Sequence, residues 1–170
     1  IAGPSSTSRA LVYIRKGYYT GWKISLQNYV DIYCEDGTVF AGYWRWVDGG
    51  SAVNCNIRGK AIYQETTSNV LYITGASNIN FEFNYIYAAS SAPIFIQSSG
   101  QSTINIEGDS IYATTVGAGY AITFRENCDV TMNIRKWINC SHGCIDIRSN
   151  FSGKLVINCP KIILNATNYY

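Results

Sequence analysis

A short pattern of alternating apolar and polar residues returns along the chain, and this repeat constrains the fold more than any other feature. Seven-residue segments that begin at Ile57 and Ile106 follow the same pattern, and related segments begin at Phe81, Ile134 and Ile157. These five anchors lie 24, 25, 28 and 23 residues apart, and the copy at Ile134 looks one residue shorter than the others. A unit this short cannot cover its own apolar face, but stacked units cover one another. The repeat therefore predicts a solenoid.

A second motif keeps nearly the same spacing and starts at Leu71, Ile94, Ile122 and Ile145. Alternation at period two predicts strands with one buried face, and the Ser-, Gly-, Asn- and Thr-rich segments between them predict turns. Together the two motifs predict an all-β fold, a single-stranded right-handed parallel β-helix with rungs of about 23–28 residues. A sandwich of antiparallel hairpins is the alternative. It would not require one pattern to return at a fixed spacing.

The repeat also divides the chain. Residues 51–170 are predicted to form regular rungs, whereas residues 1–50 hold the start of the helix and an irregular aromatic loop at Tyr43–Trp46. Ile32 lies 25 residues before Ile57 and is expected to begin the regular stack. All rungs belong to one domain. Because no signal-peptide pattern precedes the first rung, we expect a segment of a longer protein.

Composition excludes several classes of function. Charged residues make up 14% of the chain and the net charge is +2, without a basic stripe, so a nucleic-acid partner is not expected. The chain contains no apolar stretch long enough to insert in a membrane. Six cysteines form no CxxC pair and there is one histidine, so neither a metal site nor another cofactor is expected. The cysteines are expected to be buried thiols, with a disulfide between neighbouring rungs as the alternative.

Two segments near the start of the chain resemble the pectate-lyase-like family of parallel β-helix proteins. Residues 12–19 (VYIRKGYY) look like the opening strand of that fold with its following Gly-Tyr, and residues 32–38 (IYCEDGT) look like its first full rung. The resemblance implies one of two groups within the family. One comprises bacteriophage tailspikes and tail fibres, which are trimers that contact glycans of the host surface. The other comprises polysaccharide lyases and hydrolases, but the acidic calcium-binding cluster of the family's lyases has no match in this sequence.

Residues that flank the anchors are predicted to point outward and to form columns along the helix. The column before the anchors is a predicted asparagine ladder, Asn56, Asn80, Asn105, Asn133 and Val156. The column after them reads Arg58, Glu82, Glu107, Arg135 and Asn158, which predicts the pairs Arg58–Glu82 and Glu107–Arg135. Glu82 and Glu107 are the catalytic candidates, because glycosidases use two close carboxyl groups. A solvated, partly paired face is the alternative.

Aromatic residues supply the other candidate contacts. Tyr63, Tyr87 and Tyr112 are predicted to form an outward strip that either packs against a loop or partner chain or stacks on sugar rings. The second motif presents further candidates, Tyr72, Phe95, Arg125, Asp146 and Arg148. Phe95 is predicted to be exposed. The two arginines are either neutralised by Asp146 and Glu126 or free to hold an acidic sugar or another chain.

These observations favour an adhesive section of a phage tail appendage that attaches to host-surface glycans, assembled as a homotrimer in the virion with other virion proteins. A secreted or virion-associated polysaccharide lyase or hydrolase is the alternative function, and an adhesin on the bacterial cell surface is a third. Bacterial surface polysaccharide is the expected ligand in each case.

Overall fold

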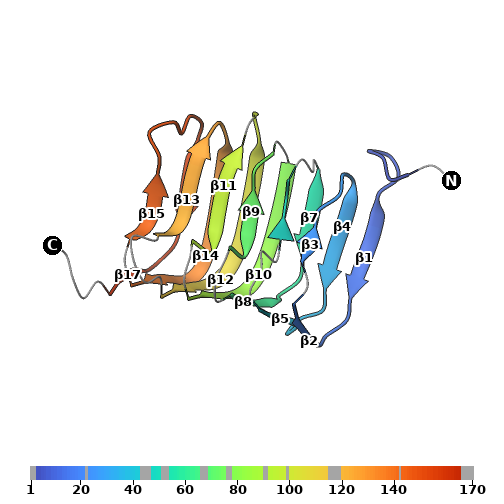
Figure 1. Cartoon of the computed structure of the whole chain (residues 1–170), viewed down its shortest axis with the longest axis horizontal. Coiled ribbons are helices and arrows are strands. Elements are labelled where there is room, and N and C mark those ends of the chain that lie inside the picture. The colour runs from blue at the N-terminus through green and yellow to red at the C-terminus, as the bar shows by residue number, and fades with distance from the viewer. Residues whose placement is uncertain are drawn as a thin grey trace.

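The chain forms a parallel β-solenoid of about 5 turns (Figure 1). The computed structural model describes residues 3–21, 23–42, 47–50, 54–65, 69–75, 78–89, 92–98, 100–114, 120–141 and 143–165. Within these ranges there are 17 strands and no helix, which confirms the predicted all-β fold. The predicted aromatic loop at Tyr43–Trp46 lies outside the described residues.

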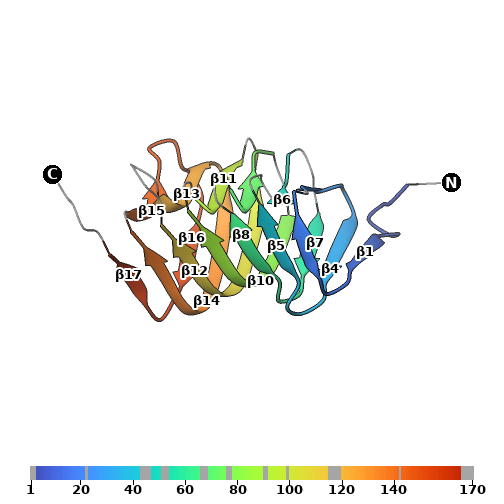
Figure 2. The same ribbon diagram turned by 60° about the horizontal axis from the view of Figure 1, so that its bottom comes forward.

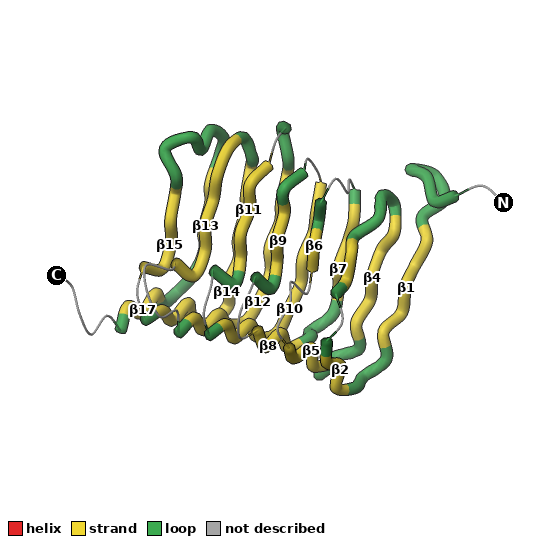
Figure 3. The backbone as a smooth tube through the Cα atoms, in the orientation of Figure 1, coloured by secondary structure: helices red, strands yellow, loops and turns green. Residues whose placement is uncertain are grey.

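Each coil of the solenoid contributes strands to three outer faces, and loops join the strands at the edges between the faces (Figure 3). Face A holds β1 (Ala10–Ile14), β4 (Val30–Cys34), β7 (Cys55–Arg58), β16 (Leu155–Asn158) and the first halves of β10 (Asn78–Ala88), β12 (Thr103–Ala113) and β14 (Asp129–Cys140). Face B holds the second halves of those long strands with β2 (Tyr18–Thr20), β5 (Val39–Gly42), β8 (Ile62–Glu65) and β17 (Ile162–Leu164). Face C holds β3 (Ile24–Ser25), β6 (Val47–Asp48), β9 (Leu71–Ile73), β11 (Ile94–Ser98), β13 (Tyr120–Glu126) and β15 (Gly143–Ile147).

The core consists of apolar columns that run through successive turns. On face C the register joins Leu71, Ile94, Ile122 and Ile145, as the second motif predicts. On face A it joins Ile32, Ile57, Phe81, Ile106, Met132 and Ile157. Residues inside the stack are fully buried, whereas Ile145 and Ile157 in the last turn are half-buried. The rungs therefore stabilise one another through their shared core.

The predicted anchor at Ile134 is wrong. Met132 is the residue paired with Ile106, and Ile134 pairs with Gly108. A bulge in β14 then inserts one residue, so that Trp137 pairs with Ser110. Such an insertion changes which side chains point outward beyond it. The β14 copy of the repeat is therefore one residue longer than the β12 copy. Because Met132 is the anchor, the column before the anchors contains Thr131 instead of Asn133, and the column after them contains Asn133 instead of Arg135.

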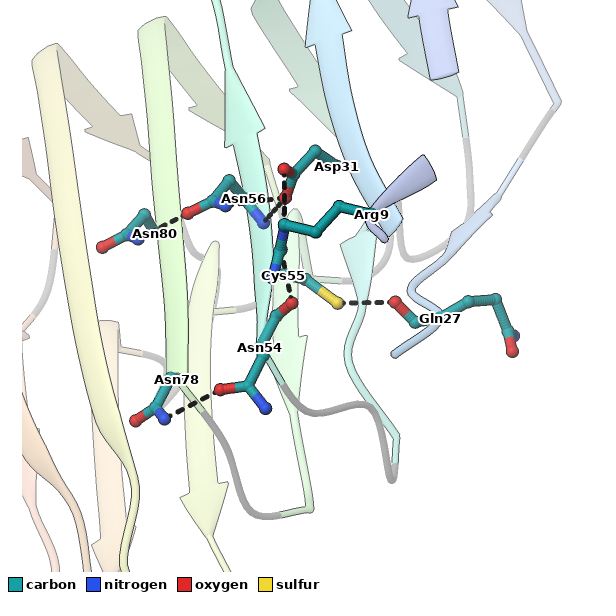
Figure 4. Close-up of polar contacts among 8 residues, drawn as sticks. All are labelled: Arg9, Gln27, Asp31, Asn54, Cys55, Asn56, Asn78 and Asn80. Atoms are coloured by element: carbon teal, nitrogen blue, oxygen red, sulfur yellow. Dashed lines mark hydrogen bonds and ion pairs between the residues drawn. The ribbon is translucent and has the colours of Figure 1, made fainter. Parts of the chain in front are cut away.

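A polar ladder crosses face A and confirms part of the predicted asparagine column (Figure 4). The Nδ2 of Asn105 donates to Asn80 at 2.9 Å, and the Nδ2 of Asn80 donates to Asn56 at 2.6 Å. Asn56 in turn donates to Asp31 at 2.6 Å, and Asp31 forms an ion pair with Arg9 at 2.5 Å. The hydrogen bond from Arg9 is the main cause of the lowered pKa of Asp31. Each of these three amides thus donates to the residue of the preceding rung, which supports the register of face A.

Candidate functional site

Four aromatic side chains lie together on the outer surface of face B. We call Tyr85, Tyr87, Tyr112 and Trp137 the aromatic cluster. Tyr85 and Tyr87 both point outward from β10 because Ile86 between them is buried in the core. Tyr87 pairs in register with Tyr112 of β12, and their rings stack with centroids 5.7 Å apart at 19°. Stacked rings on adjacent rungs form a rigid aromatic surface with little conformational freedom to lose.

Trp137 closes the cluster from the neighbouring rung. Its ring centroid lies 5.9 Å from that of Tyr85 at 75° and 6.3 Å from that of Tyr112 at 90°. Ser110, which pairs with both Tyr85 and Trp137 in register, is only 4% exposed. Burial among these rings, with smaller contributions from Tyr112 and Tyr87, raises the pKa of Tyr85. The bulge in β14 is therefore the feature that brings Trp137 into this cluster.

A groove of about 730 Å³ lies beside the aromatic cluster on face B. It crosses four successive strands, β2, β5, β8 and β10, and Figure 2 shows β5, β8 and β10 side by side. Its lining residues are Tyr18, Thr20, Gly21, Ala41, Gly42, Gln64, Tyr85 and Tyr87. Small residues form its middle, because Ala41 and Gly42 carry little or no side chain. Tyr18, 67% exposed, bounds it at β2, and Tyr85 and Tyr87 bound it at β10.

Tyr87 presents one ring face to this groove. Its other face is covered by Tyr112, whereas its register neighbour on the groove side is the exposed Gln64. Gln64 and Thr20 add an amide and a hydroxyl, which both donate and accept hydrogen bonds. Flat apolar ring faces beside a few neutral polar groups suit a ligand that is apolar on one side and rich in hydroxyl groups at its edges.

The predicted tyrosine strip is correct at Tyr87 and Tyr112 but wrong at Tyr63. Tyr63 is completely buried and pairs with Ile86, while Gln64 pairs with Tyr87. Its ring packs against Phe40 at 5.1 Å and Phe81 at 5.4 Å, and burial raises its pKa. The cause is one extra residue between β7 and β8. Ile57 pairs with Phe81, and Ile62 pairs with Tyr85. Ile62 lies five residues after Ile57, whereas Tyr85 lies only four residues after Phe81. This one-residue difference reverses which side chains of β8 point into the core.

Sequence reasoning missed Tyr18, Tyr85 and Trp137. Tyr85 was detectable, because Tyr85, Ile86 and Tyr87 alternate at period two around a buried isoleucine. Trp137 was not, because its outward direction depends on the bulge before it. Tyr18 was treated as part of the resemblance to the opening of a β-helix.

The predicted contacts on face C form a separate surface. Tyr72 and Phe95 stack with centroids 5.2 Å apart, and the guanidinium of Arg125 lies 4.9 Å from the Phe95 centroid on the next rung. Phe95 points outward but is half-buried, so the prediction that it is exposed is only partly correct. Tyr72 stacks on the Phe95 ring, and Arg125 adds a cation–π contact to the same ring.

The charges of face C are largely satisfied locally. Arg148 pairs with Asp146 at 2.6 Å, and Glu126 accepts a hydrogen bond from Gln97 at 2.9 Å. Asp146 thus neutralises Arg148, as one of the two alternatives predicts, whereas Glu126 bonds to Gln97. Among the described residues, the Nε of Arg125 and the buried Oδ2 of Asp146 have no hydrogen-bond partner, so the ion pair alone holds Asp146 to Arg148. The arrangement is an aromatic pair capped by one cation.

Glu82 and Glu107 lie opposite each other on β10 and β12, beside a small cavity of about 200 Å³ on face A. Glu82 accepts a hydrogen bond from the backbone nitrogen of Gly59 at 3.1 Å. The predicted pair Glu107–Arg135 is wrong, because Asn133 occupies the position next to Glu107. Arg135 pairs instead with Asp109 at 2.5 Å, and Lys136 pairs with the same carboxylate at 3.0 Å.

The six cysteines are free, and four of them, Cys34, Cys55, Cys128 and Cys140, are buried. Burial raises the pKa of Cys34 and that of Cys128 to about 11, so these thiols stay protonated and unreactive at neutral pH. Within the described part of the chain, no group of three or more His, Cys, Asp or Glu side chains is placed to hold a metal ion. The same residues include no helix long and apolar enough to cross a membrane.

Comparisons of the chain with known protein families, with curated proteins and with solved structures find no match.

Proposed function

We propose that this protein is a glycan-binding β-solenoid and that the face B groove is its binding site. The observation that carries the proposal is the groove itself, which the described residues form as a channel across four rungs with aromatic rings at both ends. Sugar rings have apolar faces and polar edges, so they suit the exposed face of Tyr87 and the neutral polar groups of Gln64 and Thr20. The rungs beneath hold these side chains rigidly, which reduces the entropy cost of binding.

We place this activity in a bacteriophage tail appendage, a tailspike or tail fibre, where the solenoid would attach the virion to host-surface polysaccharide. The support is the resemblance of residues 12–19 and 32–38 to pectate-lyase-like β-helices, together with the rod-like stack of rungs. A secreted protein or a bacterial surface adhesin would use the same groove. Assembly as a homotrimer, with other virion proteins at its ends, is part of the same proposal.

The test is glycan binding by matched tyrosine variants. Tyr87→Ala removes the ring that faces the groove, and we expect it to weaken binding of a polysaccharide ligand about tenfold, because one stacked ring contributes roughly 0.5–1.5 kcal/mol beyond its buried area. Tyr33→Ala is the control, since Tyr33 is 38% exposed on face A, away from the groove. Binding to a panel of bacterial polysaccharides should be measured by calorimetry. Equal affinities for the two variants would contradict the proposal.

Depolymerase activity is the second candidate. The observation in its favour is the register pair Glu82–Glu107, because in-register rungs lie roughly 4.8 Å apart and retaining glycosidases place two carboxyl groups about 5–5.5 Å apart. Against it, the Glu82 carboxylate is engaged by the Gly59 backbone, and the pair lies on face A, not in the groove. We therefore expect no reducing ends and no unsaturated uronate to be released from bacterial polysaccharides. Release that Glu107→Gln abolishes would establish the enzymatic function instead.

A further inference from the structure

We infer that the face B groove binds a neutral oligosaccharide in preference to an acidic one. This inference rests on the proposed function and names the class of ligand for the same site. All eight residues that line the groove are uncharged at neutral pH: four glycine, alanine or threonine residues, three tyrosines and one glutamine. A carboxylate or sulfate bound there would lose hydration without gaining a cationic partner, which is costly.

Three arginines are committed elsewhere. Arg9 pairs with Asp31 on face A, Arg148 pairs with Asp146 on face C, and Arg135 pairs with Asp109 at the corner between faces A and B. The charged residues that lie near the lining in sequence include Lys16, two residues before Tyr18, and Lys23, two residues after Gly21, and neither lines the groove. Lys16 interacts with Glu35, where its charge adds to the hydrogen bonds that lower the pKa of that carboxyl.

The dimensions of the groove select an oligosaccharide over a single sugar. Its lining comes from four successive rungs, which places β2 and β10 roughly 14 Å apart at about 4.8 Å per rung. Tyr18 lies at one end and Tyr85 with Tyr87 at the other, so one pyranose ring cannot contact both ends. A linear chain that lies along the solenoid axis can stack on Tyr87, cross the small residues Ala41 and Gly42 and reach Tyr18.

Gln64 provides the means to invert this selectivity. It is exposed in the middle of the groove, next to Tyr87 in register. Gln64→Lys would place a cation within reach of the bound chain, and ionic hydrogen bonds are about twice as strong as neutral ones. We expect this variant to acquire salt-sensitive binding of acidic oligosaccharides that the unchanged protein lacks.

The experiment compares oligosaccharides that differ only in charge. Neutral chains of increasing length are titrated against the intact protein, and the same chains are titrated after oxidation of their primary hydroxyl groups to carboxylates. We expect affinity to rise with length until the groove is filled, to be lost at least tenfold on oxidation, and to change little between low and high salt. Tyr87→Ala and Tyr18→Ala should each weaken binding of the neutral chain, and Tyr33→Ala should not.

The outcomes separate this inference from the proposed function. If acidic chains bind more tightly and Tyr87→Ala abolishes that binding, the groove binds glycans but the inference of a neutral ligand is overturned. If acidic chains bind and only Arg125→Ala abolishes the binding, face C is the site and both statements about the groove are overturned. If no chain binds, neutral or oxidised, the proposed function itself fails.

Discussion

Replacement of Tyr63 by alanine distinguishes a core residue from a surface residue at the position where sequence and structure disagree. The Tyr63 side chain is 0% exposed and lies between the rings of Phe40 and Phe81. A buried aromatic side chain covers about 150–250 Å², which at about 25 cal/mol per Å² gives an upper limit of about 4–6 kcal/mol. Aromatic-to-alanine changes in cores cost about 3–5 kcal/mol. We therefore expect Tyr63→Ala to lower the free energy of unfolding by about 4 kcal/mol.

Urea unfolding followed by circular dichroism measures this loss. With a slope of about 2 kcal/mol per molar urea, the midpoint should fall by about 2 M. Tyr63→Phe keeps the ring and removes only a hydroxyl whose neighbour is the weakly hydrogen-bonding thiol of Cys34, so its midpoint should change little. Tyr33→Ala, at an exposed site, should cost about 1 kcal/mol, because it removes the stacking of Tyr33 on Tyr13.

A Tyr63→Ala cost as small as that of Tyr33→Ala would refute the reasoning. It would place Tyr63 on the surface, restore the strip Tyr63–Tyr87–Tyr112, and remove Gln64 from the groove. The register of β8 against β10 would then be wrong by one residue.

Three further predictions concern the turn, the ladder and the assembly. Gly59→Ala should destabilise the fold by at least about 2 kcal/mol, because Gly59 has φ 106° and an added Cβ would lie 1.9 Å from the Cys34 carbonyl oxygen. Gly3→Ala is the matched control, since an added Cβ there has nothing within 4 Å. Equal melting temperatures of the two variants in thermal unfolding would contradict the turn geometry. Because the folded-state pKa of Asp31 is lowered from 3.8, its stabilisation is present above that pH and is lost as the pH falls through the lowered value. Asp31→Asn should thus reduce stability by up to about 1 kcal/mol at neutral pH and not in strong acid, and a difference that is independent of pH would exclude the ion pair as its cause. Light scattering on the purified protein should report the mass of a trimer, and a monomer would contradict the proposed assembly.

The repeat predicted most of the fold because its strands on face C keep one register without interruption. Leu71, Ile94, Ile122 and Ile145 pair as the spacing of the second motif indicates. Asn56, Asn80 and Asn105 likewise form the predicted ladder, since no residue is inserted before them in β7, β10 and β12. Spacing alone suffices where each rung has the same local geometry.

The candidate site was less predictable because two single-residue insertions lie next to it. Gly59 adopts a backbone conformation that L side chains rarely adopt, and the extra residue in its turn buries Tyr63. The bulge in β14 turns Trp137 outward, whereas Arg135 misses the column of Glu107 because Met132, not Ile134, pairs with Ile106. A sequence pattern does not show which residue of a rung is absorbed by a turn or bulge. The spacing of 28 residues marks a longer rung, but the bulge lies beyond Ile134 and does not cause it.

A crystal structure of the protein with a bound neutral oligosaccharide tests the central claim most directly. We predict that the sugar lies on face B along the solenoid axis, with one ring stacked on Tyr87 and its hydroxyl groups bonded to Gln64 and Thr20. A ligand bound to the Tyr72–Phe95 pair of face C, or between Glu82 and Glu107 of face A, would contradict the assignment of the groove as the binding site.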